Sequence, residues 1–329
     1  MAVTAGVDMG GTKIQTAIVR SGKPLGQARV PTPRGGPGEV LESVRSTIVD
    51  AAAAAGIAPA DLTGVGIGFP GAYDNKTGDT VSAVNLAGFD KRYPFGSRLS
   101  KAIGGAPVIF DNDVRAALLG EYRAGAGRPF KDMLGVFVGT GVGGGLILGG
   151  KLRRGQGSAG EIGHTVVSDA GRLCGCGRRG CLEAYAGRGR MELRARKLVE
   201  RGDSTILFKV MAEKGRDRLT SGVIAAALAR GDNMADQLIT DAVWALGIAL
   251  ASVQNVLDLE AIIIGGGLGD RLGPPFIDRI GAAMQPHLFM DSRPPKMLAT
   301  ELGDLSGAVG AALLALDAGA PRSQAAPVR

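Results

Sequence analysis

Every cysteine of the chain lies in one short segment, close to one of its two histidines. The segment from Glu161 to Glu183 begins with EIGH and ends with CGCGRRGCLE. It supplies one imidazole and three thiolates, a set that suits a closed tetrahedral zinc site: His164, Cys174, Cys176 and Cys181. The glycines between the cysteines would let the backbone fold tightly round an ion. We therefore predict a structural Zn²⁺ site, against the alternative of a core histidine beside three buried thiols.

The composition points to a cytoplasmic enzyme of two lobes. The cysteine count is odd and the N-terminus begins with an apolar strand pattern, so nothing indicates export to an oxidising compartment. The 329 residues exceed what one hydrophobic core usually organises. The 54 glycines interrupt every apolar run, so we expect no membrane segment. The net charge of +7 is spread along the chain without aromatic interleaving, which favours a solvated surface over a nucleic-acid partner.

Two glycine-rich turns have the same layout. Residues 2–9 form an apolar strand pattern that runs into Gly10-Gly11-Thr12-Lys13, and alternating apolar character resumes at Ile14. The segment GVFVGTGVGGGLIL at 135–148 repeats the layout of GVDMGGTKIQTAIV at 6–19. We expect two lobes that each open with a β-hairpin.

The remaining pattern predicts the order of helices and strands. Helices are expected at 37–55, 114–122, 183–201, 235–257, 275–285 and 306–316, and further strands at 65–69, 108–110 and 261–264. We expect a small α/β lobe at 1–122, joined by the helix at 306–316, and a large α/β lobe at 123–305. The hinge is expected at 125–129, and residues 317–329 are expected to be a disordered tail.

The glycine turns are interpreted as phosphate clamps. Residues 6–13 fail as a P-loop because Thr12-Lys13 stand in reversed order and a strand follows. The G-x-G-x-x-G match at 139–144 also fails, because no helical periodicity follows it. Runs of small residues can instead present backbone N–H groups to phosphate oxygens, or they can simply make tight hairpins. On the first reading, Asp8 holds Mg²⁺ through water. The residues expected to bind the nucleotide here are Asp8, Gly10, Gly11, Thr12, Lys13, Gly139, Thr140 and Gly141.

The motifs together resemble a known family. They are DMGGTK at 8–13, GFPG at 68–71, NLAGF at 85–89, DNDV at 111–114, GTGVGGGLI at 139–147, GEIGH at 160–164, CGCGRRGCLE at 174–183 and IIGGG at 263–267. Over roughly residues 3–316 the chain resembles the repressor/ORF/kinase (ROK) family of sugar kinases. Within that family it resembles the bacterial glucokinases most. The resemblance implies the actin-like ATPase (ribonuclease H-like) fold, with two α/β lobes around a central cleft.

Phosphoryl transfer to a sugar needs a carboxylate that takes the proton of the attacking hydroxyl. Asp111-Asn112-Asp113 follows the strand at 108–110, and strand alternation would place both acids on one face. Spacing therefore does not choose between them. The family resemblance implies that Asp113 is the base and that Asn112 binds sugar hydroxyls. An N-cap for the helix at Val114 is the structural alternative.

The sugar-binding residues are expected from the resemblance and from their side-chain chemistry. Carboxylates, amides and a backbone group near glycine turns would hold the sugar: Gly71, Asn85, Asn112, Asp113, Glu161, His164 and Glu183. One ring nitrogen of His164 would bind zinc while the other meets a sugar hydroxyl. Gly265, Gly266 and Gly267 would let adenosine approach the backbone, or they form a strand-to-helix turn. The family often has Ser-Gly after the last glutamate and tryptophan at the position of Phe89, and both departures bear on which sugar is bound.

The expected activity is ATP- and Mg²⁺-dependent phosphorylation of the primary hydroxyl of a hexose, glucose to glucose 6-phosphate. The alternatives are a kinase for N-acetylmannosamine, N-acetylglucosamine, fructose or mannose, and a glucokinase that uses polyphosphate. A sugar-sensing transcriptional repressor is disfavoured, since such proteins carry a helix-turn-helix ahead of the first glycine turn and this strand pattern starts within three residues of Met1. The resemblance also implies a symmetric homodimer.

Overall fold

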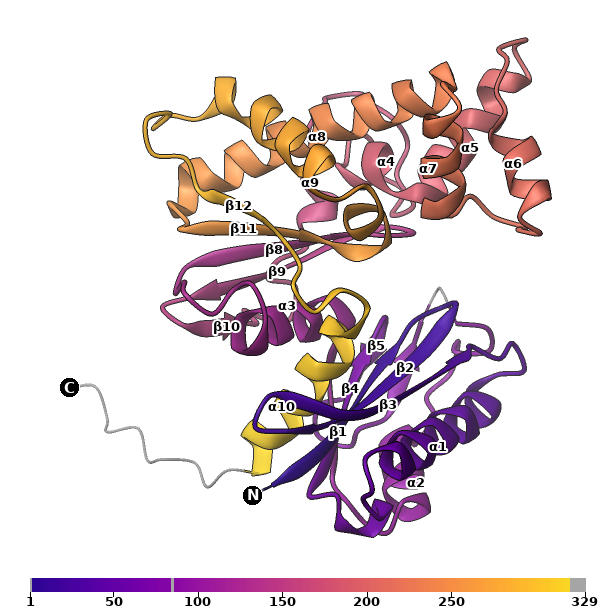
Figure 1. Ribbon diagram of the computed structural model, residues 1–329, viewed down its shortest axis with the longest axis vertical. Coiled ribbons are helices and arrows are strands. Elements are labelled where there is room, and N and C mark those ends of the chain that lie inside the picture. Colours follow the sequence, from indigo (N-terminus) through magenta and orange to yellow (C-terminus); the bar gives the residue numbers. More distant parts are fainter. Residues whose placement is uncertain (1, 84–85, 320–329) are drawn as a thin grey trace. The chain divides into compact units, whose positions relative to one another are not determined.

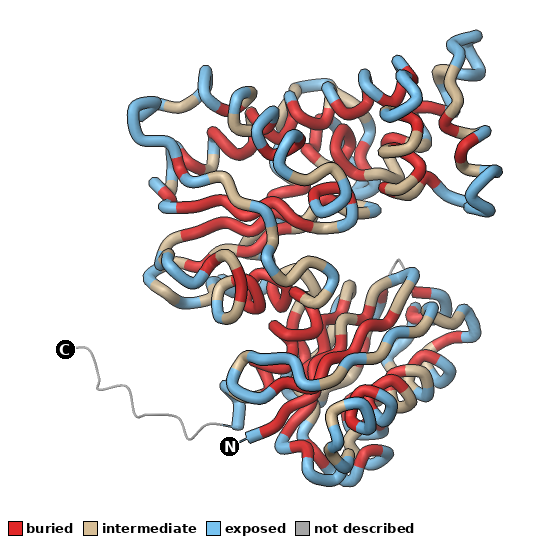
Figure 2. Tube along the Cα trace, in the orientation of Figure 1, coloured by how far each residue is buried: buried red, intermediate tan, exposed pale blue. Residues whose placement is uncertain are grey.

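The computed structural model describes residues 2–83 and 86–319, which form two compact units (Figure 1). The first unit contains the chain up to Arg128 and from Asp304 onward, and the second contains Pro129–Gly303. Buried residues follow the central strands of each unit (Figure 2). Each unit has its own apolar core, which is the expected consequence of the chain's length.

The first unit is a five-stranded sheet with helices on it. Its elements are β1 (Val3–Met9), β2 (Lys13–Arg20), β3 (Lys23–Pro31), α1 (Pro37–Ala54), the 3₁₀ turn η1 (Pro59–Asp61), β4 (Gly64–Phe69), β5 (Ala72–Tyr73), β6 (Thr80–Ser82), α2 (Phe95–Ala102), β7 (Val108–Asn112), α3 (Asp113–Ala124), η4 (Gly303–Leu305) and α10 (Ser306–Gly319). The strand order is β3-β2-β1-β4-β7. The first three strands are antiparallel, while β4 and β7 run parallel to β1.

The second unit repeats this sheet. Its elements are β8 (Met133–Val138), β9 (Val142–Leu148), β10 (Lys151–Arg153), η2 (Ile162–His164), α4 (Glu183–Ala186), α5 (Arg188–Val199), α6 (Leu207–Glu213), α7 (Ser221–Ala229), α8 (Asn233–Leu257), β11 (Ala261–Gly265), α9 (Gly266–Met284), η3 (Gln285–His287) and β12 (Lys296–Ala299). The order β10-β9-β8-β11-β12 has the same directions as the first sheet. The repeated hairpin layout and the actin-like α/β fold are therefore confirmed.

Helix α10 packs against the first sheet at very short range. A methyl group at Gly66 of β4 would lie 1.7 Å from the carbonyl oxygen of Ala311 in α10. One at Gly310 of α10 would lie 1.7 Å from the carbonyl oxygen of Ala116 in α3. Only glycine allows backbones to approach this closely. The last helix thus fixes β1, β4 and α3, the elements that carry the candidate residues of this unit.

Two local expectations were wrong, and one was incomplete. The helix expected at 183–201 is broken into α4 and α5, because Gly187 is extended (φ −73°, ψ 127°). The helix expected at 275–285 is present as the part of α9 after Gly273, whose non-helical backbone (φ 63°, ψ −153°) separates it from a shorter helical segment that begins at Gly266. Strand alternation does not extend through Asp113, because β7 ends at Asn112 and Asp113 begins α3.

Helix α8 is the one helix in the described part of the chain that is long and apolar enough to cross a membrane. Its length and composition are the only basis for that result. Of its most apolar stretch, 56% is buried inside the second unit, where Leu238, Leu246 and Leu250 belong to the core. A core helix passes the same test, so packing accounts for its hydropathy.

Candidate functional site

The first glycine turn connects β1 to β2 and is braced from β3. The backbone N–H of Gly10 donates to the carbonyl of Lys13 at 3.0 Å, and the Thr32 hydroxyl donates to the Gly10 carbonyl at 2.6 Å. Gly11 and Thr12 are exposed, and among the described residues their backbone N–H groups have no acceptor. A turn with its carbonyls bonded and its N–H groups free is suited to phosphate oxygens.

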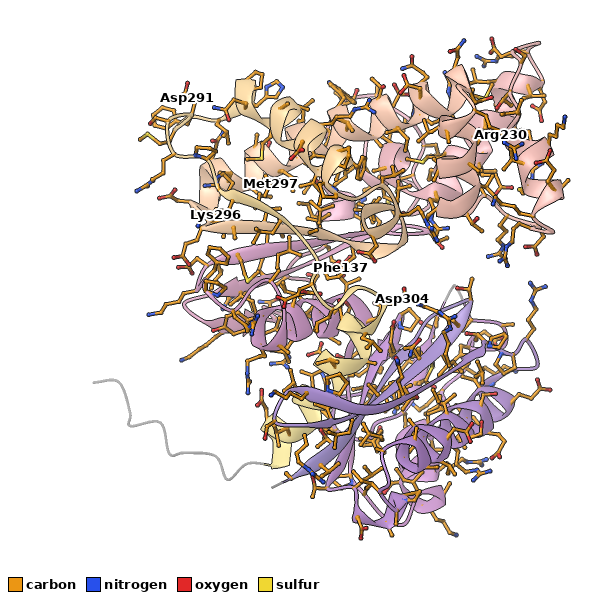
Figure 3. All side chains as sticks on the ribbon, viewed as in Figure 1. Phe137, Arg230, Asp291, Lys296, Met297 and Asp304 are labelled. Carbon is orange, nitrogen blue, oxygen red and sulfur yellow. The ribbon has the colours of Figure 1, made fainter. Side chains whose placement is uncertain are left out.

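Lys13 at the end of this turn has an anionic partner. Its ammonium lies 2.8 Å from a carboxylate oxygen of Asp304, which stands just before α10 (Figure 3). Asp304 also pairs with Arg29 at 3.4 Å and is well exposed, so both pairs are worth little. The phosphates of a ligand could therefore take the place of Asp304 at Lys13 with little loss of stability.

Two carboxylates lie close together at the carboxyl end of the first sheet. Asp8 is partly buried at the end of β1, against the first turn of α10 at Gly307. Burial, and then the neighbouring charge of Asp113, raise the pKa of Asp8 to about 7. Lys13 opposes this rise and Asp304 adds to it. Two acids that resist ionising together fit a site for a divalent cation, so the donor set suits Mg²⁺.

The two acids of the DND motif, Asp111 and Asp113, lie in different surroundings. Asp111 is 1% exposed, and its Oδ1 accepts from the Arg115 Nε at 2.7 Å and from the Asn112 backbone N–H at 2.8 Å. The Tyr73 hydroxyl donates to the same oxygen at 3.3 Å. This carboxylate is committed to a buried ion pair and cannot turn towards a substrate.

Asn112 caps helix α3, and Asp113 is the first residue of that helix. The side-chain oxygen of Asn112 accepts from the backbone N–H of Val114 at 3.0 Å and of Arg115 at 3.1 Å. Its amide NH₂ has no acceptor in the described part of the chain, which leaves it available to a hydroxyl group. Asp113 stands in the first turn of the helix, at the positive end of the helix dipole.

The second glycine turn, between β8 and β9, also contains an internal backbone hydrogen bond, here between residues two apart. The Gly139 N–H donates to the Gly141 carbonyl at 2.8 Å. The carbonyls of Gly139 and Thr140 accept from the Arg188 and Gly189 N–H groups at 3.1 and 3.0 Å. Within the described ranges the N–H groups of Thr140 and Gly141 donate to nothing. The first turn of α5 thus holds this turn from behind and leaves its N–H groups open.

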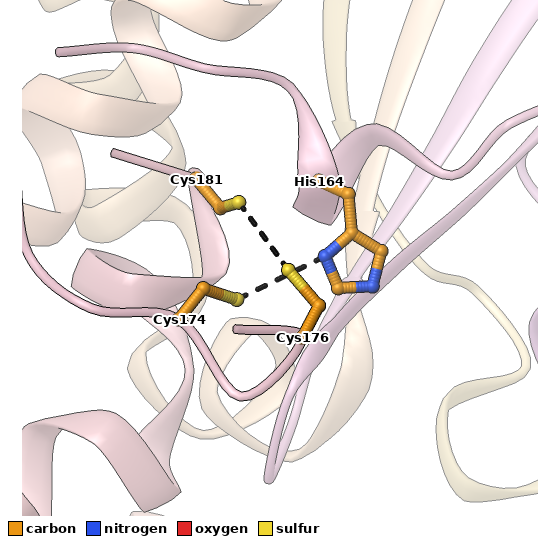
Figure 4. Close-up of side chains that lie close together, drawn as sticks. All are labelled: His164, Cys174, Cys176 and Cys181. Carbon is orange, nitrogen blue, oxygen red and sulfur yellow. Dashed lines mark hydrogen bonds between the residues drawn. The ribbon is translucent and has the colours of Figure 1, made fainter. Parts of the chain in front are cut away.

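The cysteine and histidine side chains converge (Figure 4). Their four ligand atoms lie within 4.8 Å of one another. The Cys176 and Cys181 sulfurs are 3.7 Å apart, and the Cys174 sulfur is 3.9 Å from the His164 Nδ1. A disulfide needs about 2.05 Å, while two sulfurs at Zn–S bonds of about 2.3 Å in a tetrahedron are about 3.8 Å apart. The geometry excludes a disulfide and fits a zinc ion.

The three thiols of the cluster differ in how readily they lose their protons. Burial raises the pKa of the Cys174 thiol to about 12 and also raises that of Cys181. The exposed Cys176 accepts hydrogen bonds from Arg178, which lower its pKa to about 6. Cys176 is therefore the thiolate that a metal would meet first, and binding would then displace protons from the buried pair.

Glu183 connects the cysteine loop to the second glycine turn. One carboxylate oxygen lies 3.6 Å from the Cys174 sulfur, and the other accepts from the Val142 N–H at 3.0 Å. Glu161 is exposed at the start of η2, and the His164 Nε2 points away from the sulfurs (Figure 4). The structure thus brings His164 and Glu183 to the same cluster.

The other predicted residues lie at turns. Gly71 precedes β5, where a methyl group would lie 2.2 Å from the Ser82 carbonyl oxygen. Gly265 ends β11, and Gly266 and Gly267 open α9, so their backbone N–H groups stand at a helix N-terminus. Asn85 lies outside the described residues. Sequence reasoning missed Thr32, Arg115, Arg188 and Asp304, whose partners are far along the chain or, for Arg115, in the strand that precedes its helix.

The sequence of the chain matches the model of one protein family. The model of the ROK family matches residues 4–318. The chain belongs to the ROK family. Both glycine turns, the DND motif and the cysteine loop lie inside the matched range, as the sequence resemblance predicted.

Members of the ROK family resemble the chain over nearly its whole length. A glucokinase of Streptomyces coelicolor is 33% identical over 321 residues, covering 96% of this chain and 98% of that protein. An N-acetylmannosamine kinase of Yersinia pestis is 33% identical over 315 residues, with 94% and 97% covered. A solved ROK glucokinase of Streptomyces griseus, in complex with glucose and AMPPNP, has a TM-score of 0.81 and 33% identity, with 96% and 100% covered.

Proposed function

We propose that this ROK-family protein is a hexokinase-type phosphotransferase that converts glucose and ATP to glucose 6-phosphate and ADP. The observation that carries the proposal is the separation of Asp111 from Asp113. One acid is locked in a buried ion pair, and the other stands beside a second carboxylate at a helix N-terminus. The identity to glucokinases at 33% over nearly the full length supports the choice of reaction.

In the proposed mechanism Asp113 is the general base. Its carboxylate accepts the proton of the primary hydroxyl as the hydroxyl oxygen bonds to the γ-phosphorus and the bond to the ADP oxygen breaks. Asn112 holds the first turn of α3 through its oxygen and offers its NH₂ to a sugar hydroxyl. The rigid cap fixes the carboxylate against the sugar, so the protein supplies orientation as well as a base.

Each glycine turn, taken by itself, offers groups that can bind phosphate oxygens of the donor. Free N–H groups at 11–12 and 140–141 offer hydrogen bonds to phosphate oxygens, and the ammonium of Lys13 offers charge. Mg²⁺ bound near Asp8 would neutralise the charge that develops on the phosphate oxygens. Gly265, Gly266 and Gly267 would let adenosine approach the backbone closely.

Zinc in the cysteine cluster would have a structural role. It would orient His164 through Nδ1 and leave Nε2 for a sugar hydroxyl, with Glu183 held beside it. The other residues proposed to contact the sugar are Gly71, Asn85, Glu161, His164 and Glu183. The homodimer implied by the family resemblance stays a prediction, which light scattering of the pure protein would check.

A coupled assay over a panel of sugars and donors tests the function. We expect the highest kcat/KM for glucose with ATP, and lower values for fructose, mannose, N-acetylglucosamine and polyphosphate. N-acetylmannosamine is the second candidate, because an N-acetylmannosamine kinase is equally similar at 33% identity. Turnover of N-acetylated sugars with none of glucose would remove the glucokinase proposal and favour that candidate.

A further inference from the structure

Arg188 begins helix α5 directly behind the second glycine turn. Its backbone N–H donates to the Gly139 carbonyl, and its guanidinium reaches the Thr140 hydroxyl at 3.4 Å and the Leu219 carbonyl at 3.5 Å. Both side-chain bonds are at the outer limit of length, so they are weak. The Nε is buried and has no partner within the described part of the chain. Most of the five N–H donors of this guanidinium are therefore unused.

The position of this arginine is unfavourable without an anion. A cation in the first turn of a helix opposes the helix dipole, which favours acidic groups there. Among the described residues no carboxylate lies within ion-pair distance of the Arg188 guanidinium, and burial lowers its pKa. A residue that conflicts with its local structure in this way is a signal of function.

The space beside the guanidinium lies between two predicted nucleotide-binding turns. On one side are Thr140 and the free N–H groups of the turn. On the other is Gly267 at the start of α9, where a methyl group would lie 3.8 Å from the Arg188 Nη2 and 3.1 Å from the Ser221 hydroxyl. Glycine therefore keeps open the space that Arg188 and Ser221 flank.

We propose that Arg188 binds the phosphate groups of the nucleotide, as a donor-binding residue additional to the two glycine turns. This inference rests on the proposed function, since it assumes that ATP is the donor. A phosphate supplies the negative charge that Arg188 lacks and accepts two parallel N–H bonds from a guanidinium. The guanidinium thus joins the turn at 139–141 to the turn at 265–267 through the ligand.

The test compares Arg188→Met and Arg188→Lys with Arg201→Met, which removes the same charge just beyond the other end of α5. Arg201 is exposed and serves as the matched control. The measured quantities are the KM for ATP, the KM for glucose, and the inhibition constants of ADP and adenosine against ATP. We expect Arg188→Met to raise the constants for ATP and ADP by about 10- to 100-fold, the range for a charged hydrogen bond. Adenosine and glucose should be unaffected.

Arg188→Lys keeps the charge but cannot donate two parallel bonds, so an intermediate loss is expected. This variant also keeps the test informative if Arg188→Met folds poorly. Equal weakening of ADP and adenosine would overturn the proposal in favour of a structural role for Arg188, and unchanged ADP inhibition would overturn it too. Both results leave the kinase function standing. A wild-type protein that neither binds nor uses ATP would overturn the proposed function together with this inference.

Discussion

Asp111 and Asp113 are two residues apart, yet their surroundings differ completely. Asp111 faces Arg115 and Tyr73 in the core, whereas Asp113 begins α3 and raises the pKa of Asp8 by its charge. The difference in surroundings between the two acids arises from the backbone, because the change from strand to helix falls between Asn112 and Asp113. The two acids therefore respond differently to the same substitution.

Asp111→Asn should destabilise the protein and spare the chemistry. It leaves the buried Arg115 guanidinium without its charge partner, which costs about 3–5 kcal/mol of unfolding free energy. Urea unfolding measures this loss, and the kcat of the folded fraction should stay within about tenfold of wild type. Asp111→Leu combined with Arg115→Met removes both charges and should recover part of the stability. Full stability of Asp111→Asn with no turnover would contradict this assignment.

Asp8→Asn should stabilise the metal-free protein in a pH-dependent way. The folded-state pKa of Asp8 is raised, from 3.8 to about 7, so the folded protein holds this proton more tightly than the unfolded chain. Its stabilising effect is complete below about pH 4 and is lost as the pH rises through 7. The unfolding free energy of Asp8→Asn minus that of wild type should grow by roughly 4 kcal/mol between pH 4 and 7.5.

Asp50→Asn on the exposed face of α1 is the matched control, because it makes the same substitution at a solvent-exposed position. A difference between Asp8→Asn and wild type that does not change with pH would show that the Asp8 carboxyl is ionised in the folded protein at neutral pH, as in the unfolded chain.

At the scale of elements, the cysteine loop is a segment that a metal would organise. Between η2 and α4 the chain from 165 to 182 has no helix and only isolated bridge pairs, and its backbone hydrogen bonds join the segment mainly to itself. Its four candidate ligands and the Glu183 bond to Val142 tie it to the second glycine turn. Loss of the ion should therefore loosen both segments together.

Cys176→Ser should lower zinc content and glucose affinity together. The exposed Cys176 is the thiolate with the lowered pKa, and its loss leaves three ligands in place of four. Metal analysis by mass spectrometry and the KM for glucose are the measurements. Leu173→Ser, also exposed in this loop but without a ligand atom, should change neither. A pure wild-type protein without zinc would refute the four-ligand site.

The sequence predicted best where the signal is local. Cys174, Cys176 and Cys181 are close in sequence, so their convergence with His164 followed from spacing alone. The two glycine turns were also predictable, because each is a short run of small residues. The break at Gly187 was not predictable, because the Arg188 and Gly189 N–H groups that follow it donate to the Gly139 and Thr140 carbonyls, which are far away in sequence.

At the scale of the whole molecule, the chain uses one sheet topology twice. The first copy ends in the DND motif, and the second contains an insertion of the cysteine loop and helices α4 to α8 between its β10 and β11 strands. The repeated glycine turns made this duplication predictable. Arg188 and Asp304 were not predictable, because their significance depends on which turns the fold brings beside them.

In the proposed reaction Asp113 takes the proton of the sugar hydroxyl during an ATP-dependent transfer. The most direct measurement is glucose 6-phosphate formation by Asp113→Asn, with glucose binding followed by calorimetry and Asp111→Asn as the matched charge control. The kcat of Asp113→Asn should be about 10²- to 10⁴-fold lower than that of the wild-type protein, with glucose affinity retained. A rate near that of the wild-type protein would contradict it.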